Sequence, residues 1–558
     1  MFSGLRVQVG SNHRAPLWIS GAVGVLACVL LYCGWRLHWF LTDDAFIAFR
    51  YIDHRRRGFG YTWNPPPFLP VEGYTSFAWV VILDGVWSVL GIPPPQAANV
   101  LSLWCAYGTL ALTAWATWRV CRLHEVAAAF PWCLACVLLA TVSHRSFLVW
   151  ASGGLETALF NLCLQGFVLH GLLGRCDTPA SAERYLLGLS GLSTLAALTR
   201  PEGLLPAATS GAIALLFVGL GNLAWSRALL ALSPLAAVMT HLLWRVRFYG
   251  ELLPNTYYAK VVASWPEAGL RYLGSFVLEY GYYLAMPLWL YGLWQLGRRV
   301  VSRLKAYAAG SGEPDAASAR HGLAQSLARA GVLACVLSKL EFDVFIAGGD
   351  HFEYRALSYL VPLLALAFLH GLLSARLRPA LVYACFVGFI AVSSWLPWSL
   401  YTRTRDFHRW PPNPPVERLA SDAPWPLQPV AAALDELQGW LIPHGVGVRH
   451  AAHRGFWLNQ LEYTPSRDEG ARQCAQSDHP LAAAGTIGVI GWVLPGCYVL
   501  DILGLNDYVV ARTPLPEGQE RYMAHDRSVP PGYLERLMPN VSIKGHALTI
   551  YPRPTPLT

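Results

Sequence analysis

The chain has 558 residues, of which 54% are hydrophobic and only 14% are charged, and its mean hydropathy is +0.35. Soluble domains carry about 25% charged residues, so this composition excludes an ordinary soluble protein. The formal net charge of +8 does not indicate nucleic-acid binding. The basic residues gather in short loops between apolar runs, as the positive-inside rule expects of cytoplasmic loops, and no recognition fold accompanies them.

Apolar runs recur from Pro16 to Leu400, and many approach the ~20 residues that cross a bilayer. We therefore predict a polytopic α-helical membrane protein with about eleven spans. The first run, 17–41, has basic residues before it and no small-residue cleavage pattern after it. This is typical of a retained helix rather than a removed signal peptide.

One pair of runs conflicts with a simple topology. If 75–91 and 97–118 both crossed the membrane, Arg119 and Arg122 would lie outside, against the positive-inside rule. We expect one of the two runs to be re-entrant or interfacial.

The amino-acid composition changes after Leu400. Residues 401–558 are rich in Pro, Arg and polar residues, and no run among them is long enough to span. We predict an amphipathic helix over 430–441 and short β-strands over 486–493 and 498–503. The chain then divides into a membrane domain, 1–400, and a small α/β domain, 401–558, which span parity assigns to the external face.

The C-terminal region has two cysteines, Cys474 and Cys497. In an oxidising compartment they would form a disulfide. Two unpaired thiols are the alternative.

Two adjacent carboxylates, Asp43 and Asp44, follow the first apolar run and open the first external segment, 42–74. An acidic pair at this boundary is costly to hold near lipid, so it is a functional-site hypothesis by default. Further polar clusters fall on the same predicted face. They contain Asn64, Glu72 and Tyr74; Arg145 and Glu156; Arg200; Asn255, Tyr258 and Lys260; and Asp350, His351 and Arg355.

Cations around a carboxylate pair suit group transfer from a lipid phosphate. The cations stabilise the leaving phosphate, and a carboxylate deprotonates the acceptor hydroxyl or acts as nucleophile. We expect Asp43 to react, with Asp44 supporting it or exchanging roles, because neighbouring residues on an extended loop point in different directions. The donor phosphate is assigned to Arg200, Lys260, Arg355 and Arg145. The sugar or acceptor is assigned to Glu72, Tyr74, Asn64, Glu156, Asn255, Tyr258, Asp350 and His351.

Each feature also has a purely structural interpretation. A Lys or Arg at the end of a span can be a snorkelling anchor. Asp44 and Glu156 could each cap a helix, and Gly348-Gly349-Asp350 could be only a tight turn. The carboxylates could hold Mg²⁺ or Mn²⁺, but oxygen ligands on a loop do not establish a metal site, so no cofactor is assigned.

Several motifs taken together resemble a known family. They are Asp43-Asp44-Ala45-Phe46-Ile47-Ala48-Phe49-Arg50-Tyr51, Gly58-Phe59-Gly60-Tyr61-Thr62-Trp63-Asn64-Pro65, Val71-Glu72-Gly73-Tyr74-Thr75-Ser76-Phe77, Gly154-Leu155-Glu156-Thr157, Thr199-Arg200-Pro201-Glu202-Gly203, Leu253-Pro254-Asn255-Thr256, Gly348-Gly349-Asp350 and Asp501-Ile502-Leu503-Gly504-Leu505-Asn506-Asp507. With these motifs the chain resembles the GT-C membrane glycosyltransferases. Within them it is most similar to AftB-like arabinofuranosyltransferases of the bacterial envelope.

The resemblance implies a multi-pass enzyme of the bacterial inner membrane that takes polyprenyl-phospho-arabinofuranose at the external face. The acceptor would be an envelope glycan or a surface protein such as a pilin, and the acidic pair would be catalytic. The absence of a Gly-rich phosphate loop agrees with a lipid-linked rather than a nucleotide-linked sugar. His351 and Phe352 depart from the family's pattern, which leaves the role of Asp350 open.

Two alternatives remain. The same fold could transfer mannose, an aminosugar or another hexose. A lipid-linked sugar translocase without chemistry is disfavoured, because the ionisable residues lie at one face and no repeated halves are visible.

Overall fold

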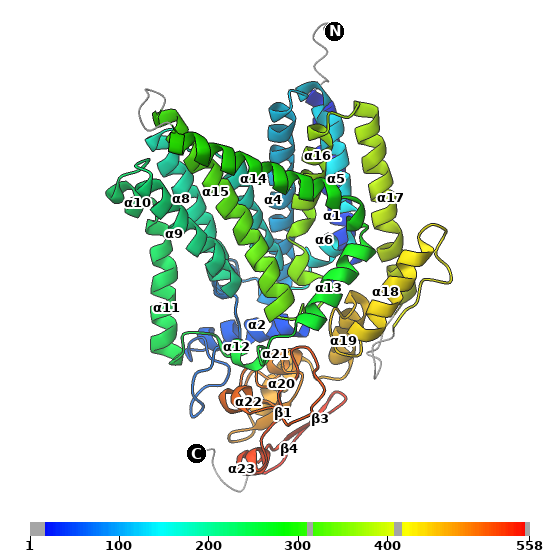
Figure 1. Ribbon diagram of the computed structural model, residues 1–558. Helices are drawn as coiled ribbons and strands as arrows, with labels where there is room; N and C mark the ends of the chain where they lie inside the picture. The colour runs from blue at the N-terminus through cyan, green and yellow to red at the C-terminus, as the bar shows by residue number, and fades with distance from the viewer. Residues whose placement is uncertain (1–16, 310–315, 407–415, 553–558) are drawn as a thin grey trace, which may run out of the picture.

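The computed structural model describes residues 17–309, 316–406 and 416–552. A bundle of helices stands above a C-terminal region, and helix α2 lies across the junction between the two (Figure 1). The bundle contains α1 (Leu17–Leu37), α2 (Asp43–Arg56), α3 (Phe77–Leu90), α4 (Pro94–Leu123), α5 (Phe130–Val142), α6 (Arg145–Trp150), α7 (Thr157–Leu173), α8 (Pro179–Thr199), α9 (Leu204–Gly219), α10 (Trp225–Ala231), α11 (Ala236–Tyr249), α12 (Asn255–Lys260), α13 (Pro266–Glu279), α14 (Met286–Ala309), α15 (Ala316–Glu341), α16 (Leu360–Ser374) and α17 (Pro379–Thr404).

The C-terminal region is smaller and mixed. Its helices are α18 (Gln428–Leu441), α19 (His450–Glu462), α20 (Arg467–Cys474), α21 (Gly488–Val493), α22 (Tyr508–Arg512) and α23 (Tyr533–Leu537). Its strands are β1 (Leu481–Ala484) and β2 (Tyr498–Asp501), which pair in parallel, and β3 (Val541–Lys544) and β4 (Ala547–Ile550), which pair antiparallel.

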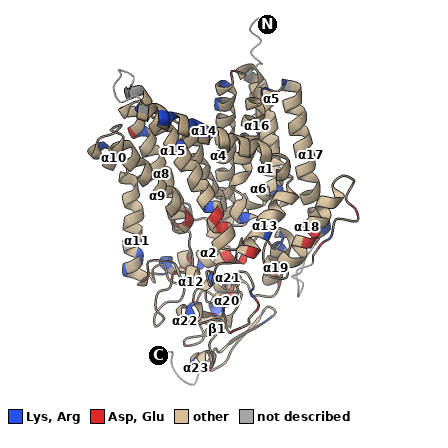
Figure 2. Ribbon diagram, in the orientation of Figure 1, with Lys and Arg blue, Asp and Glu red and all other residues tan. Residues whose placement is uncertain are grey.

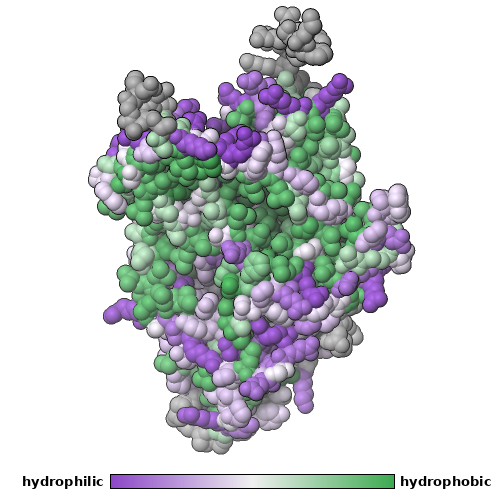
Figure 3. All heavy atoms as spheres, viewed as in Figure 1, coloured by the Kyte–Doolittle hydropathy of each residue, from purple (hydrophilic) through white to green (hydrophobic). Residues whose placement is uncertain are grey.

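The chain is a polytopic α-helical membrane protein. Apolar atoms cover the middle of the bundle and hydrophilic residues cover both ends (Figure 3). By length and composition, four helices in the described part of the chain can cross a membrane, or five if the bent pair 225–231 and 233–249 is one span. This is fewer than the expected eleven, because several apolar runs form helices of only 10–17 residues.

Helix α4 makes the crossing that the sequence left open between 75–91 and 97–118. The Trp35 indole N–H donates to the Asn99 carbonyl (3.1 Å), so α4 begins beside the end of α1. At its other end, Arg119 donates to the Leu173 carbonyl (3.0 Å) at the end of α7. The 14-residue α3 is shorter than the ~20 residues that cross a bilayer, and its re-entrant or interfacial placement stays a prediction.

The acidic pair lies on a helix and not on an extended loop, which corrects the sequence-based expectation. Thr42 caps α2, because its hydroxyl accepts the Ala45 N–H (3.1 Å), so Asp44 is not the cap. The residues from Ala45 to His54 are all buried. A helix buried on all sides must be packed on several faces, and α2 is enclosed by the bundle and the C-terminal region.

The structure changes one predicted strand. The amphipathic helix over 430–441 is α18 and the strand over 498–503 is β2, but the segment 486–493 contains helix α21. Parallel strands need a crossover of about a dozen residues, and residues 485–497 form the crossover between β1 and β2. The β-propensity of 486–493 is overridden by this topology.

Candidate active site

A cavity of about 770 Å³ lies where the bundle, α2 and the C-terminal region meet. Most of its wall comes from the bundle, and Leu505, Met523 and Ala524 close it from the C-terminal region. Acidic residues gather around this junction (Figure 2). Eight of the sequence-predicted site residues line it: Asp44, Tyr74, Glu156, Arg200, Lys260, Asp350, His351 and Arg355.

The acidic pair is divided between two environments. Asp44 lines the cavity, and 31% of its side chain is exposed. Asp43 instead accepts the backbone N–H groups of Gly488 (3.0 Å) and Val489 (2.8 Å) in α21. Consecutive side chains on a helix point about 100° apart, which separates the two carboxylates. Of the two, Asp44 faces the cavity, whereas Asp43 was expected to react.

The two carboxylates also differ in charge state. Burial raises the pKa of Asp43 to about 6, with a smaller contribution from the neighbouring Asp44. Burial acts in the same direction on Asp44, but Lys260 and then Arg355 outweigh it and lower its pKa. The Lys260 ammonium lies 3.7 Å from the Asp44 carboxylate. Asp44 is therefore ionised at neutral pH and can accept a proton.

Three cations line the cavity, and two of them are tightly paired. Arg200 contacts Glu156 and Glu202, each at 2.7 Å. Arg355 contacts Asp350 at 2.8 and 3.2 Å. The 3.7 Å contact of Lys260 with Asp44 is longer than these, so Lys260 is the cation with the loosest carboxylate contact.

The break after α8 places Arg200 in the cavity. Arg200 has an extended backbone (φ −150°, ψ 147°), and a short 3-10 helix, Pro201–Gly203, follows it. A Cβ on Gly203 would lie 2.2 Å from the Ala196 carbonyl carbon, so only glycine allows the chain to turn here. An irregular backbone within an apolar stretch is tolerated where it lines a cavity.

A pair of histidines stands near Asp44. The His351 Nδ1 lies 2.6 Å from the Gly445 carbonyl, and the His525 Nδ1 lies 2.9 Å from the Met523 carbonyl. A carbonyl can only accept, so each Nδ1 carries the proton and each Nε2 offers a lone pair. The two rings are 4.9 Å apart, and burial lowers the pKa of both. His351 lines the cavity and gives it a neutral hydrogen-bond acceptor, and His525 packs against His351.

Sequence reasoning missed several of these groups. His525 comes from the C-terminal region, and nothing in its local sequence marks it. Asp343 lines the cavity and binds Lys339 (2.6 Å). Both residues lie in an apolar run, where a pair of opposite charges can be recognised from the sequence. Glu202 could have been chosen because it shares the chain break with Arg200.

Arg145 and Glu72 do not line the cavity, although both were expected to bind substrate. Both guanidinium ends of Arg145 bind Glu353, and both side chains are 1% exposed. Glu72 binds Arg245 at 2.7 Å and is buried. A buried carboxylate or guanidinium that is already paired has little capacity for a ligand.

Asn64, Asn255 and Tyr258 also lie outside the cavity wall. The Asn64 amide exchanges two hydrogen bonds with the backbone of Val499, both 2.9 Å. The Asn255 amide donates to the Gly504 carbonyl (2.8 Å), and the Tyr258 hydroxyl donates to Glu251 (3.2 Å). The two asparagines therefore join the bundle to the C-terminal region instead of facing a substrate.

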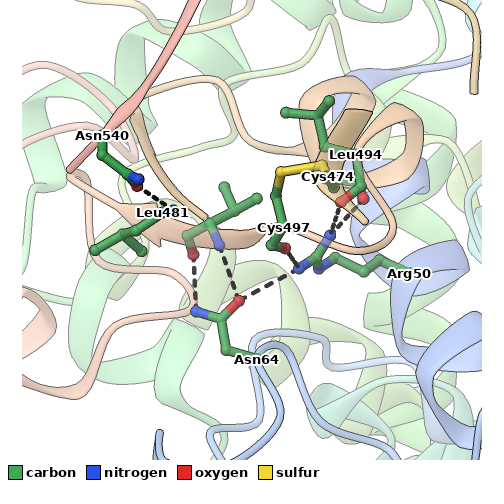
Figure 4. Close-up of a disulfide and its surroundings, with 9 residues drawn as sticks. Arg50, Asn64, Cys474, Leu481, Leu494, Cys497 and Asn540 are labelled. Carbon is green, nitrogen blue, oxygen red and sulfur yellow. Dashed lines mark hydrogen bonds between the residues drawn. A yellow bond between two sulfur atoms is a disulfide. The ribbon is translucent and has the colours of Figure 1, made fainter. Parts of the chain in front are cut away.

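The predicted cysteine pair is also structural. Cys474 and Cys497 form a disulfide, and the Arg50 guanidinium donates to the Cys497 carbonyl at 2.7 Å (Figure 4). Among the residues that the structure describes, no group of three His, Cys, Asp or Glu side chains is arranged to hold a metal ion.

No protein-family model matches the chain, and no curated protein matches it. Among solved structures, the chain is similar to ArnT from Cupriavidus metallidurans bound to undecaprenyl phosphate. The identity is 14%, the TM-score is 0.45, and the likeness covers 86% of this chain and 85% of ArnT.

Proposed function

We propose that the chain is a GT-C-type glycosyltransferase that moves a sugar from a polyprenyl phosphate to an acceptor hydroxyl. The observation that carries this proposal is that the ionised Asp44 shares one cavity with Arg200, Lys260 and Arg355. The wall also contains apolar side chains that suit a prenyl chain, among them Leu204, Leu205, Phe345 and Ile346.

In the proposed reaction, Asp44 accepts the proton of the acceptor hydroxyl. The acceptor oxygen bonds to the anomeric carbon, and the bond from that carbon to the phosphate oxygen breaks. The electron pair leaves with the polyprenyl phosphate, whose added charge Lys260 and Arg355 stabilise. His351 accepts a hydrogen bond from a hydroxyl group of the acceptor or sugar. Asp350 orients Arg355, and Glu156 orients Arg200.

The membrane domain over 1–400 and the α/β domain over 401–558 fit this role, with the latter on the external face of a bacterial inner membrane. We propose arabinofuranose as the sugar, because the motifs around Asp43 and Glu72 resemble those of arabinofuranosyltransferases. The acceptor would be an envelope glycan or a surface protein.

A cationic aminosugar is the second candidate. Among the residues that the structure describes, six carboxylates and three Lys or Arg side chains line the cavity. The carboxylates are Asp44, Glu156, Glu202, Glu341, Asp343 and Asp350; the cations are Arg200, Lys260 and Arg355. This acidic excess favours a substrate that carries a positive charge.

The test is transfer by the purified protein in lipid nanodiscs, offered polyprenyl phosphates of arabinofuranose, mannose and an aminosugar. Asp44→Asn should abolish transfer, while Glu251→Gln should retain it. Glu251 is a matched control, because its side chain is 29% exposed and pairs with Arg512 outside the cavity wall. Full turnover of Asp44→Asn would refute the assigned base, and transfer from none of the lipids would refute the proposed activity.

A further inference from the structure

Helix α21 is held at both ends by α2. At its beginning, the Asp43 carboxylate accepts the N–H groups of Gly488 and Val489. At its end, the Arg50 guanidinium donates to the carbonyls of Gly491 (2.6 Å) and Leu494 (3.1 Å). The carboxylate meets the positive end of the helix dipole and the guanidinium meets the negative end.

The spacing of the two side chains matches the helix that they hold. Asp43 and Arg50 lie about two helical turns apart, so they project from one face of α2. The six-residue α21 lies along this face. Arg50 is 1% exposed and also donates to the Trp63 carbonyl (2.9 Å), so its guanidinium is fixed.

Two glycines permit this close approach. A Cβ on Gly488 would lie 1.8 Å from the Asp43 carbonyl oxygen, and a Cβ on Gly491 would lie 2.6 Å from the Trp63 ring. Neither position accepts a larger residue without displacing α21 from α2. The contact is therefore built into the sequence of α21 as well as that of α2.

We propose that Asp43 is a positioning residue: by holding α21 it fixes the first turn of α2, so that Asp44 faces the cavity. This inference rests on the proposed function for its kinetic consequence. In the first turn the N–H groups have no intrahelical partner, and the Thr42 cap and the Asp43 contact both help to hold it. The C-terminal region thereby orients the reacting carboxylate through the neighbouring residue.

The experiment compares Asp43→Asn and Gly488→Ala with a control variant outside the contact between α2 and α21. Arg512→Ala is the control rather than Arg467→Ala, because Arg467 donates to the Trp492 carbonyl within α21. Arg512 joins the C-terminal region to the bundle through Glu251 (2.8 Å), on the loop before α12, rather than through α2 or α21. Hydrogen exchange of the 486–494 amides reports the contact. Kinetics with the lipid donor report its consequence.

We expect Asp43→Asn and Gly488→Ala to lower kcat on the order of ten- to hundred-fold with little change in KM for the lipid. Both should speed exchange in 486–494, and Arg512→Ala should do neither. Two results for Asp43→Asn would overturn the proposal. In the first, kcat falls although amide exchange in 486–494 is unchanged. In the second, kcat is retained although this exchange becomes faster. The first result would indicate that Asp43 is itself the reacting carboxylate.

A readout without activity separates this proposal from the proposed function. If the wild type transfers no sugar, carbodiimide labelling of Asp44 still reports its orientation. Altered labelling in Asp43→Asn and Gly488→Ala, but not in Arg512→Ala, would support positioning. Equal labelling in all three variants would refute it.

Discussion

The ammonium of Lys260 lies 3.7 Å from the carboxylate of Asp44, and each side chain is about one-third exposed to the cavity. This distance leaves Lys260 able to turn toward a phosphate. The same ammonium lowers the pKa of Asp44, so in the proposed reaction one cation serves both the base and the leaving group.

Replacing Lys260 should therefore change two measurements. Lys260→Ala removes the largest of the charges that lower the Asp44 pKa. The acid limb of the kcat/KM profile should move to higher pH, because the pKa of Asp44 rises, and kcat/KM should fall by about ten-fold or more. Lys305→Ala, an exposed residue of α14, is the control. An acid limb that stays in place would show that Lys260 does not tune the base.

His351 predicts different effects on the two substrates, the acceptor and the lipid donor. His351→Ala removes a neutral hydrogen-bond acceptor from the cavity wall but no charge that binds phosphate. We expect KM for the acceptor to rise about five- to ten-fold, the loss of one hydrogen bond, with KM for the lipid donor unchanged. His546→Ala is a matched control, because the His546 Nδ1 also contacts a carbonyl, that of Thr464 (2.9 Å), outside the cavity wall. An equal rise in the lipid KM would contradict an acceptor-side role.

The buried carboxyl group of Glu72 should make the stability of the protein depend on pH. Burial raises its pKa from 4.5 to about 7, and the opposing effect of Arg245 is smaller. The folded state therefore holds this proton more tightly than the unfolded chain. The stabilisation is complete below pH 4.5 and is lost as pH rises to about 7, by at most about 3 kcal/mol.

The measurement is the unfolding midpoint in detergent between pH 4.5 and 8. Glu72→Gln should flatten this part of the curve, since its amide does not titrate. A slope that is identical in the wild type and Glu72→Gln would assign the pH dependence to other groups.

The disulfide predicts a local loss of stability on reduction. Cys474 and Cys497 are 23 residues apart, a loop for which a bridge contributes about 3 kcal/mol. Reductant, or Cys474→Ser with Cys497→Ser, should lower the unfolding midpoint of the C-terminal region and speed amide exchange around β2. Cys28→Ser with Cys33→Ser, two exposed free cysteines, should change neither. Equal midpoints with and without reductant would contradict the prediction.

The sequence by itself determined the class of protein, because hydropathy is a property of composition and needs no partner. It also determined the break at Arg200, where glycine and proline interrupt an apolar run, and it marked Asp44, Lys260 and Arg355 as polar groups at one face. In the structure these three residues line one cavity. This agrees with their expected position at one face, since residues at the same membrane depth can lie close together.

Tertiary structure alone decided which aspartate faces the cavity. Asp43 and Asp44 are chemically identical neighbours, and only the docking of α21, more than 440 residues away in the chain, turns one toward backbone N–H groups and leaves the other free. The same holds for Asn64 and Asn255, whose partners are backbone carbonyls and amides of the C-terminal region. Backbone groups occur at every residue and carry no sequence signal, so contacts with them are visible only in the folded chain.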